Sequence, residues 1–204
     1  MPRIDASNIA EHVRIQDRRV LDAAQALLEE RGYADTDMGD IAEAVGLARS
    51  SLYRYYPSKD HIVVACVKRA MAPVLDRLQV LRDAHADPVA RIHEWLAVQL
   101  AFATGPEHAT VKLIGEIRHV SPGLQQDIAA LHEEPAAVLR EAVEAVTAQT
   151  GRDPALVMKL ISGVVNAGAT HALESGQTGE VHQVLLEMID SLLGVSAVRT
   201  EAEE

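Results

Sequence analysis

The chain has few aromatic residues and almost no cysteine. Only 3% of its 204 residues are aromatic, and cysteine, tryptophan and phenylalanine each occur once. The lone cysteine, Cys66, excludes an internal disulfide bond and any metal site built from several cysteines. It lies in the apolar stretch IVVACVKRA, where we expect a small core residue and not a redox sensor. This composition fits a reducing cytoplasm, which is the location that we expect.

Sequence features that mark several other protein classes are also missing. No apolar run reaches the length needed to span a bilayer, and the N-terminal MPRIDASNIAEHVR has no apolar core of a secretion signal. The chain has neither a nucleotide-binding glycine loop nor the serine turn of the hydrolases. We therefore expect no membrane association, no enzyme activity and no cofactor.

The charge of the chain is strongly acidic, with one local exception. The net charge is −11 at pH 7, which argues against a protein that coats nucleic acid indiscriminately. From Leu47 to Lys59, however, the chain contains three cations, Arg49, Arg54 and Lys59, and no acidic residue, which gives a local charge of +3. A protein that binds specific DNA sites needs a local positive face and not a basic chain, so this segment is compatible with DNA binding.

Residues 36–60, TDMGDIAEAVGLARSSLYRYYPSKD, have the spacing of a helix-turn-helix unit. Ile41 and Val45 are four residues apart, so they share one face of a first short helix. Gly46 follows at the position where a left-handed helix cap favours glycine. Leu52 and Tyr55, three residues apart, are expected to give a second short helix its buried face. The outward residues of this second helix are Arg49, Ser50, Ser51, Tyr53 and Arg54, a set suited to base edges and phosphates.

Almost every other segment also has a helical pattern, and we find neither a strand pattern nor an internal repeat. Residues 1–12 are expected to form a partly ordered arm. Asp87-Pro88, Ser121-Pro122 and Asp153-Pro154 each combine a capping side chain with proline at the first helical position, which predicts three helix starts. A further helix is expected over 107–119. Pro73 and Pro135 lie inside helical patterns, where we expect kinks or breaks.

Residues 18–60 resemble the DNA-binding domain of tetracycline-repressor-like (TetR family) transcription regulators. The resemblance rests on three stretches, RRVLDAAQALLEERGY, TDMGDIAEAVGL and LYRYYPSKD. It implies an all-α protein of about nine helices, with a three-helix, homeodomain-like helix-turn-helix domain over residues 1–60. Residues 61–204 would then form a helical domain for effector binding and dimerisation.

The same resemblance implies the partners of the protein. These are a double-stranded DNA operator with two-fold symmetry, a second copy of the chain and an unknown small-molecule effector that loosens DNA binding. We therefore expect a ligand-responsive repressor. The alternative is a helical protein that binds a small molecule or a metal and has little DNA-binding activity.

The resemblance also assigns contacts by position. It places the outward residues of the second short helix in the DNA groove, and Thr36 and Lys59 at phosphates. Ala48 stands where relatives carry a serine that caps the recognition helix, and Gly39 stands where some relatives carry a contacting side chain. Either Thr36 or Asp37 is expected to cap the helix that follows.

All four tyrosines lie within the first 60 residues. Tyr53 is the best candidate for a phosphate or base contact. Tyr55 and Tyr56 are expected to hold the recognition helix against its neighbours, because aromatic residues at helical spacing usually belong to a core.

The last two expected helices, at about 154–175 and 180–193, are candidates for a dimer interface. The first has small residues at Gly163, Ala167, Gly168 and Ala172, which allow close helix contact. The second has a continuous apolar stripe. Two such helices from each subunit would form a four-helix bundle. The alternative is that both stripes face the core of their own subunit.

The effector site is sought among polar and aromatic residues of apolar helices, since ligand cavities combine apolar walls with a few polar groups. The candidates are Trp95, Gln99, Phe102, Glu116, His119 and Asn166. Core packing or plain solvent exposure is the alternative for each of them. Glu116 and His119 also have the spacing of a di-iron ligand pair, and His171 and Glu174 have the reverse order. A true site needs two pairs of the first kind, so we expect no metal.

Overall fold

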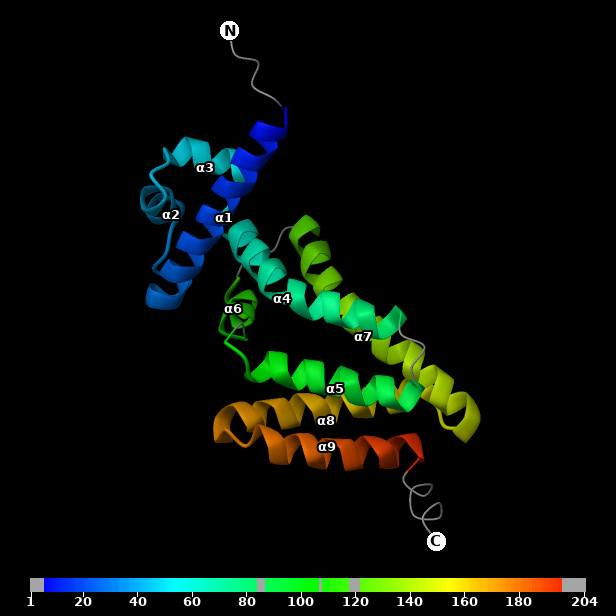
Figure 1. Cartoon of the computed structure of the whole chain (residues 1–204). Coiled ribbons are helices and arrows are strands. Elements are labelled where there is room, and N and C mark those ends of the chain that lie inside the picture. The colour runs from blue at the N-terminus through cyan, green and yellow to red at the C-terminus, as the bar shows by residue number, and fades with distance from the viewer. Residues whose placement is uncertain (1–5, 84–86, 107, 118–121, 196–204) are drawn as a thin grey trace. The chain divides into compact units, whose positions relative to one another are not determined.

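Nine α-helices and one short 3-10 helix form the part of the chain that the structure describes, and no strand occurs in that part (Figure 1). The computed structural model describes residues 6–83, 87–106, 108–117 and 122–195. The prediction of an all-α fold is confirmed. The helices are α1 Ala6–Arg31, α2 Met38–Ala44, α3 Arg49–Tyr55, α4 Lys59–Asp83, α5 Pro88–Thr104, α6 His108–Lys112, the 3-10 helix η1 Leu113–Glu116, α7 Pro122–Thr150, α8 Pro154–Ser175 and α9 Thr178–Leu193.

The chain divides into two compact units. Unit 1 comprises Met1–Ala70 and Ala109–Ile128, and unit 2 comprises Met71–His108 and Ala129–Glu204. The expected boundary at residue 60 therefore falls inside unit 1. The reason is that the first turns of α4 carry Ile62 and Cys66, which are fully buried in the core of unit 1.

Unit 1 has two apolar clusters. The first joins the buried faces of α1, α2 and α3 to the start of α4 and contains Val20, Leu21, Ala24, Met38, Ile41, Ala42, Val45, Leu52, Ile62 and Cys66. The second joins Leu28 of α1 and Val63 of α4 to Leu113, Ile117 and Leu124. This second cluster explains why the segment from α6 to the start of α7 belongs to unit 1.

The turn between α2 and α3 follows the predicted geometry. Gly46 adopts a left-handed backbone with φ +68°, which a side chain would strain. Asp37, and not Thr36, caps α2: its carboxylate accepts hydrogen bonds from the backbone N–H groups of Gly39 and Asp40. Ala48 precedes α3 in an extended conformation and provides no capping side chain.

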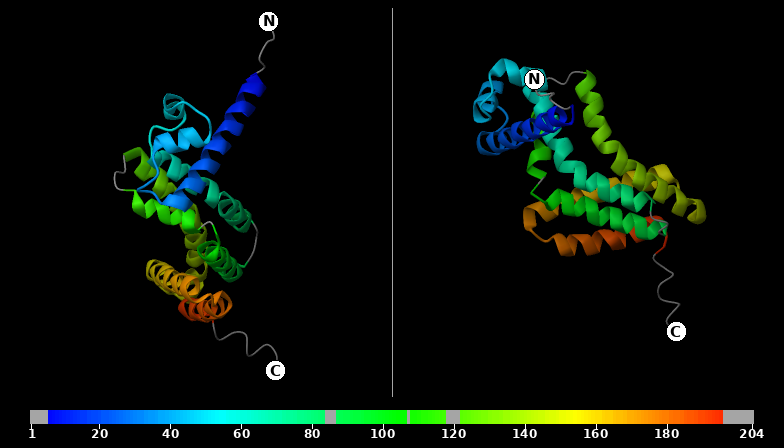
Figure 2. Two further views of the ribbon diagram at one scale, coloured as in Figure 1. Left: turned by 90° about the vertical axis from the view of Figure 1, so that its left-hand side faces the viewer. Right: turned by 45° about the horizontal axis from the view of Figure 1, so that its top comes forward.

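Unit 2 is built from α5, α8 and α9 with the longer part of α7 and the end of α4. Asp87 and Asp153 cap α5 and α8 as the sequence predicts, each directly before a proline. α8 and α9 lie side by side, as Figure 2 shows from two directions. Gly168 permits this close packing, because a Cβ atom there would lie 2.8 Å from Leu185 Cδ1 of α9.

Several element boundaries differ from the sequence prediction. Helix α1 already begins at Ala6, since residues 6–19 contain helix-forming residues and neither glycine nor proline. Helices α4 and α7 continue through Pro73 and Pro135, so neither proline breaks its helix, while the expected kinks stay predictions. The expected helix at 107–119 is instead the short α6 followed by η1.

Candidate functional site

Helix α3 presents a polar, positively charged surface to solvent. Arg49, Ser50, Tyr53 and Arg54 are exposed, and Ser51 is half-buried beside them. The Arg49 guanidinium donates to the Tyr53 hydroxyl at 3.5 Å and lies 5.9 Å from the centre of its ring. The Arg54 guanidinium donates to the Ser51 hydroxyl at 3.1 Å. These weak contacts between exposed groups order the donors on one helix surface and leave most of their hydrogen-bonding capacity to a ligand.

Contacts on the opposite side attach α3 to the rest of unit 1. Leu52 is fully buried in the first apolar cluster. The Tyr56 hydroxyl, directly after the helix, donates to the Asp17 carboxylate of α1. Burial and then this carboxylate raise the pKa of Tyr56 far above its ordinary value, so the hydroxyl keeps its proton. The expectation for Tyr55 is wrong, because α3 ends there and the ring is 37% exposed.

The start of α2 adds a negative group close to α3. Two backbone N–H groups and the nearby Arg49 lower the pKa of the Asp37 carboxyl, which therefore stays ionised as a helix cap. Gly39 is part of this arrangement. A Cβ atom at Gly39 would lie 2.9 Å from the capping oxygen and 3.9 Å from an Arg49 nitrogen. The missing side chain at Gly39 thus gives room to the cap, a reason that the sequence alone did not reveal.

The structure does not support the expected phosphate contact by the Thr36 side chain. Thr36 is fully buried, and its hydroxyl donates to the carbonyl oxygens of Gly32 at 2.9 Å and Leu27 at 3.3 Å. Leu27 lies in the last turns of α1, and Gly32 directly follows Arg31, the last residue of that helix. The Thr36 side chain therefore closes the end of α1 and does not face solvent.

Lys59 is also turned inward within unit 1. Its ammonium group donates to the carbonyl oxygens of Tyr33 and, at 2.7 Å, Thr36, and it lies 3.9 Å from the centre of the Tyr33 ring. The Tyr33 hydroxyl donates to the Asp60 carboxylate, so the start of α4 is tied to this loop at two points. Of the three cations expected to form a local positive face, Arg49 and Arg54 remain exposed.

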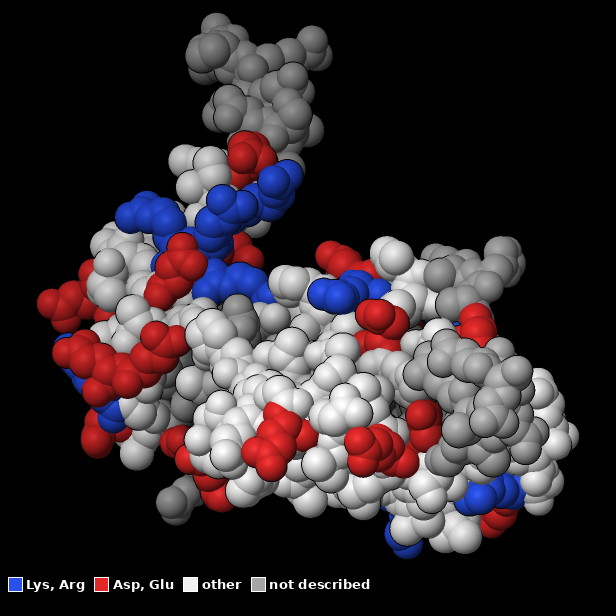
Figure 3. Space-filling model, turned by 60° about the horizontal axis from the view of Figure 1, so that its bottom comes forward, with Lys and Arg blue, Asp and Glu red and all other residues white. Residues whose placement is uncertain are grey.

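Figure 3 shows how charged residues are distributed over one face of the molecule. Lysine and arginine gather mainly in the upper part of this face, with aspartate and glutamate between them (Figure 3). The rest of that face carries mostly uncharged and acidic residues. This face has no extended basic surface of the kind that supports binding to DNA of any sequence.

A cavity of about 290 Å³ lies in unit 2 between α5, α7 and α8. Three of the residues predicted for an effector site, Trp95, Gln99 and Asn166, line it together. The Trp95 indole N–H donates to the carbonyl oxygen of Pro135 at 2.8 Å and thereby joins α5 to α7. Sequence analysis missed the α7 contribution, because nothing in the pattern shows which face of α7 turns toward α5.

The other three predicted effector residues do not line the cavity. Phe102 is half-buried elsewhere on α5, since the cavity follows the side of Trp95, Gln99 and Ala103. Glu116 belongs to η1, which is part of unit 1 and not of unit 2. The prediction for His119 lies outside the described residues. Spacing along the sequence therefore grouped residues that folding assigns to different units.

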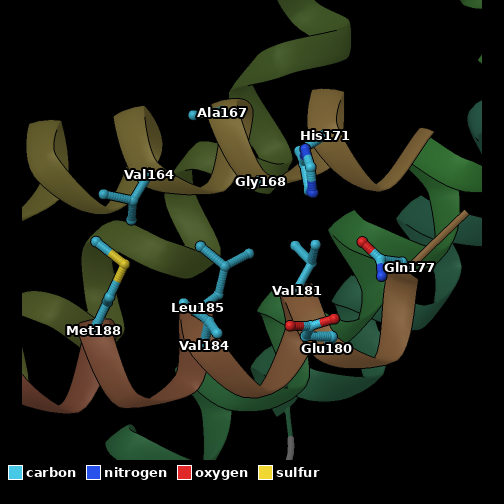
Figure 4. A pocket seen from close by; sticks show the side chains of 10 residues that line it. All are labelled: Val164, Ala167, Gly168, His171, Gln177, Glu180, Val181, Val184, Leu185 and Met188. Atoms are coloured by element: carbon cyan, nitrogen blue, oxygen red, sulfur yellow. The ribbon is translucent and has the colours of Figure 1, made fainter. Parts of the chain in front are cut away.

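A second hollow in unit 2 is a groove of about 330 Å³ between α8 and α9. Figure 4 shows Val164 and His171 pointing from α8 toward the side chains of Val181, Leu185 and Met188 on α9. The groove continues onto an exposed apolar face that includes Leu156, Leu160, Val184 and Met188. We call the residues that line this groove, together with Leu156 and Leu160, the α8–α9 face. A contiguous exposed apolar surface of this kind is typical of a surface that contacts another protein.

The α8–α9 face also bears on why α8 contains so many apolar residues. Within the described residues, Pro154–Ser175 is the one helix long and apolar enough to cross a membrane, although a composition of this kind is weak evidence. The expectation that no stretch reaches this length is corrected accordingly. Unit 2 explains the apolar residues in another way, since one side of α8 packs into its core and the other forms the α8–α9 face.

The metal alternative gains no support from the described residues. No group of three or more histidine, cysteine, aspartate or glutamate side chains gathers among them in a way that could hold a metal ion. His171 and Glu174 of the reversed pair are both exposed on α8. Cys66, the single thiol, is not part of a metal-binding group either. It is buried, and its sulfur lies 3.7 Å from the Leu21 carbonyl oxygen. Burial raises the pKa of this thiol to about 11.

Known proteins match this arrangement. Residues 20–66, from α1 into α4, match the model described as bacterial regulatory proteins, tetR family. The HTH-type transcriptional regulator EthR of Mycobacterium tuberculosis is 31% identical over 98 residues, which are 48% of this chain and 45% of EthR. The uncharacterized HTH-type transcriptional regulator YvaF of Bacillus subtilis is 32% identical over 126 residues, 60% of this chain and 64% of YvaF.

The likeness in three dimensions extends beyond the matched segment. The crystal structure of the regulator FadR of Bacillus subtilis, in complex with stearoyl-CoA, has a TM-score of 0.65 at 17% identity. It covers 87% of this chain and 98% of that chain, which shows a common fold. By sequence, the chain spans about half the length of the curated relatives it matches.

Proposed function

Since this chain belongs to the TetR family of bacterial regulatory proteins, we propose that it is a sequence-specific DNA-binding repressor that a small molecule releases from its operator. The observation that carries the proposal is the surface of α3. Its donors and two arginines face solvent, while Leu52 fixes the helix in the core of a three-helix unit. Helix α3 is then the recognition helix, with Arg49, Ser50, Tyr53 and Arg54 as its base and phosphate contacts.

The proposal includes a homodimer formed through the α8–α9 face. Four large apolar side chains are exposed on this face, and monomeric proteins rarely leave such a contiguous surface in water. Pairing α8 and α9 with their copies about a two-fold axis buries the face in a four-helix bundle. Two recognition helices related by this axis read half-sites about one helical turn apart, so the operator is palindromic.

The small packing residues of α8 serve two purposes in this arrangement. Gly168 and the buried Ala172 allow the close contact of α8 with α9 inside the subunit. Gly163 and Ala167 are exposed, and a Cβ atom at Gly163 would meet open space. The latter pair is therefore available for close contact with a second subunit. Under this proposal, both alternatives left open by the sequence apply, each to a different side of α8.

The effector is proposed to occupy the cavity between α5, α7 and α8. Two long helices continue from one unit into the other without a break: α4, from Lys59 to Asp83, and α7, from Pro122 to Thr150. A ligand in the cavity changes the packing of α7, which is joined to α4 by the ion pairs of Arg82 with Glu134 and Glu141, and thereby acts on both helices that continue into unit 1. In a dimer this changes the separation of the two recognition helices, and a fixed operator spacing then no longer fits. The protein acts as a cytoplasmic regulator and not as an enzyme.

Selection of bound duplexes from random DNA tests the DNA-binding function directly. The full chain is expected to enrich a palindromic sequence, and sedimentation should show one dimer on each duplex. Arg49→Ala should lower affinity for that sequence by roughly 1–3 kcal/mol if Arg49 reads a base. No enrichment at low salt would remove the proposal and leave a helical small-molecule-binding protein with little DNA-binding activity.

A further inference from the structure

The walls of the α5–α7–α8 cavity differ between its inner part and its mouth. Trp95, Leu139 and Val165 are buried and form apolar inner walls. His132, Ser162 and Asn166 are exposed and lie at the mouth. A ligand that enters therefore leaves water for apolar contacts inside, and it passes polar groups where the cavity opens.

The cavity carries no full charge along its described lining. None of the described residues that line it is lysine, arginine, aspartate or glutamate. A carboxylate or phosphate moved into the apolar inner part would lose its hydration and find no cation to replace it. An ammonium group would likewise find no carboxylate. The lining therefore selects against ionic ligands.

One hydrogen-bond donor inside the cavity is left without a partner. The Gln99 side-chain Nε2 is buried, and no hydrogen-bond acceptor lies within reach of it. The neighbouring Trp95 indole N–H, in contrast, is already bonded to Pro135. A buried donor without a partner is unfavourable, and a ligand that supplies an acceptor removes this penalty.

We infer that the effector is a small, uncharged and largely apolar molecule whose carbonyl oxygen accepts a hydrogen bond from Gln99. Ketones, esters and amides belong to this class. A volume of about 290 Å³ lies at the lower end of the range for small-molecule sites, which limits the ligand to a compact molecule. This inference rests on the proposed function, since only a regulator has an effector. The affinity of the cavity for a ligand, however, is measured without DNA.

Tryptophan fluorescence provides the test, because Trp95 is the single tryptophan of the chain and lines the cavity. The full-length protein is titrated with a panel of C6–C12 methyl ketones and methyl esters, and with the matching carboxylates and acyl-CoA thioesters. At least one neutral carbonyl compound should give a saturable change in emission, and it should bind about tenfold or more tightly than its matching carboxylate. Equal or tighter binding of the charged compounds would overturn the inference, as would the absence of any saturable binding up to ~1 mM.

Gln99→Met removes the donor and keeps the length of the side chain. It should weaken binding of the best neutral carbonyl compound about tenfold, the usual effect of one hydrogen bond. Gln149→Met, at an exposed position of α7, is the matched control and should leave binding unchanged. Thermal melting of both variants shows whether they fold. Unchanged affinity in folded Gln99→Met would contradict the assigned contact.

Failure of this inference and failure of the proposed function give different results. If the cavity prefers charged molecules while random-DNA selection yields a palindrome, the ligand class is wrong and the regulator remains. If neutral carbonyl compounds bind through Gln99 while no DNA is enriched, the ligand class stands and the regulator is refuted.

Discussion

Lys59 provides a test of how unit 1 is organised. The family resemblance implies that Lys59 contacts a DNA phosphate, whereas in the structure it contacts backbone carbonyls of its own chain. Its ammonium group donates to the carbonyl oxygens of Tyr33 and Thr36 and lies against the Tyr33 ring. Lys59→Met keeps the apolar stem and removes all three interactions. Hydrogen bonds to charged groups contribute roughly 1.5–3 kcal/mol each, but Lys59 is half-buried and partly screened by water. We expect a loss of about 2 kcal/mol in the free energy of unfolding.

The consequence is measurable without DNA. For a chain of this size a loss of about 2 kcal/mol lowers the thermal midpoint by about 4–8 °C. Circular dichroism during heating, with urea unfolding as a second method, measures the change. At temperatures where the variant is folded, its affinity for the selected operator should remain close to that of the unchanged protein.

The salt dependence of operator binding separates the two assignments of Lys59. Each phosphate contact contributes about −0.9 to the slope of log affinity against log salt. A Lys59 that contacts a phosphate in each subunit would therefore reduce the slope by about 2 when replaced. We expect no such reduction in Lys59→Met. Arg54→Met, which changes an exposed residue of α3, should reduce the slope and leave the unfolding midpoint nearly unchanged. A reduced slope with unaltered stability in Lys59→Met would refute the reasoning.

Three further predictions concern other parts of the chain. The Cys66 thiol, with its pKa raised to about 11 by burial, should resist iodoacetamide at pH 8 until the protein unfolds, and rapid alkylation of folded protein would contradict its burial. The free energy of unfolding should also fall between pH 9 and 11, because the unfolded thiol ionises first. Ala48→Ser should add the missing cap of α3 and raise stability by about 1 kcal/mol in urea unfolding, whereas a loss would show that the cap geometry is not accessible. Met188→Asp on the α8–α9 face should give monomers in sedimentation, while the equally exposed Leu173→Asp outside the groove should not, and dimers in both variants would refute the interface.

Local features of the fold were predictable from the sequence because they depend on neighbouring residues. Asp87 and Asp153 cap helices whose first residue is proline, and Gly46 adopts the left-handed conformation expected of it. Each of these features requires only a few adjacent residues and their backbone preferences. The missing cap at Ala48 was implied by the resemblance, because relatives carry a capping serine at this position.

The direction of long polar side chains was not predictable, because it depends on groups distant in the sequence. Lys59 turns inward because carbonyls at residues 33 and 36 end a loop beside the start of α4. Thr36 turns inward because its hydroxyl donates to the carbonyl oxygens of Leu27 and Gly32. A sequence pattern shows that these residues are polar. It does not show that these side chains form their hydrogen bonds with polar groups of the protein itself and not with DNA.

The inward turn of Lys59 changes the electrostatics of the proposed complex. The exposed cations of α3 are then Arg49 and Arg54, so the recognition helices of one dimer provide four arginines. At about −0.9 for each neutralised phosphate, α3 alone would give a salt slope no steeper than about −4. A single subunit would contribute half of this, on a chain whose net charge is −11. The non-specific attraction that α3 itself provides is therefore weak, and affinity for an operator depends strongly on base contacts made by both subunits together. It follows that loss of the dimer should abolish operator binding even where α3 is intact, because a single subunit provides half of these arginines and contacts one half-site.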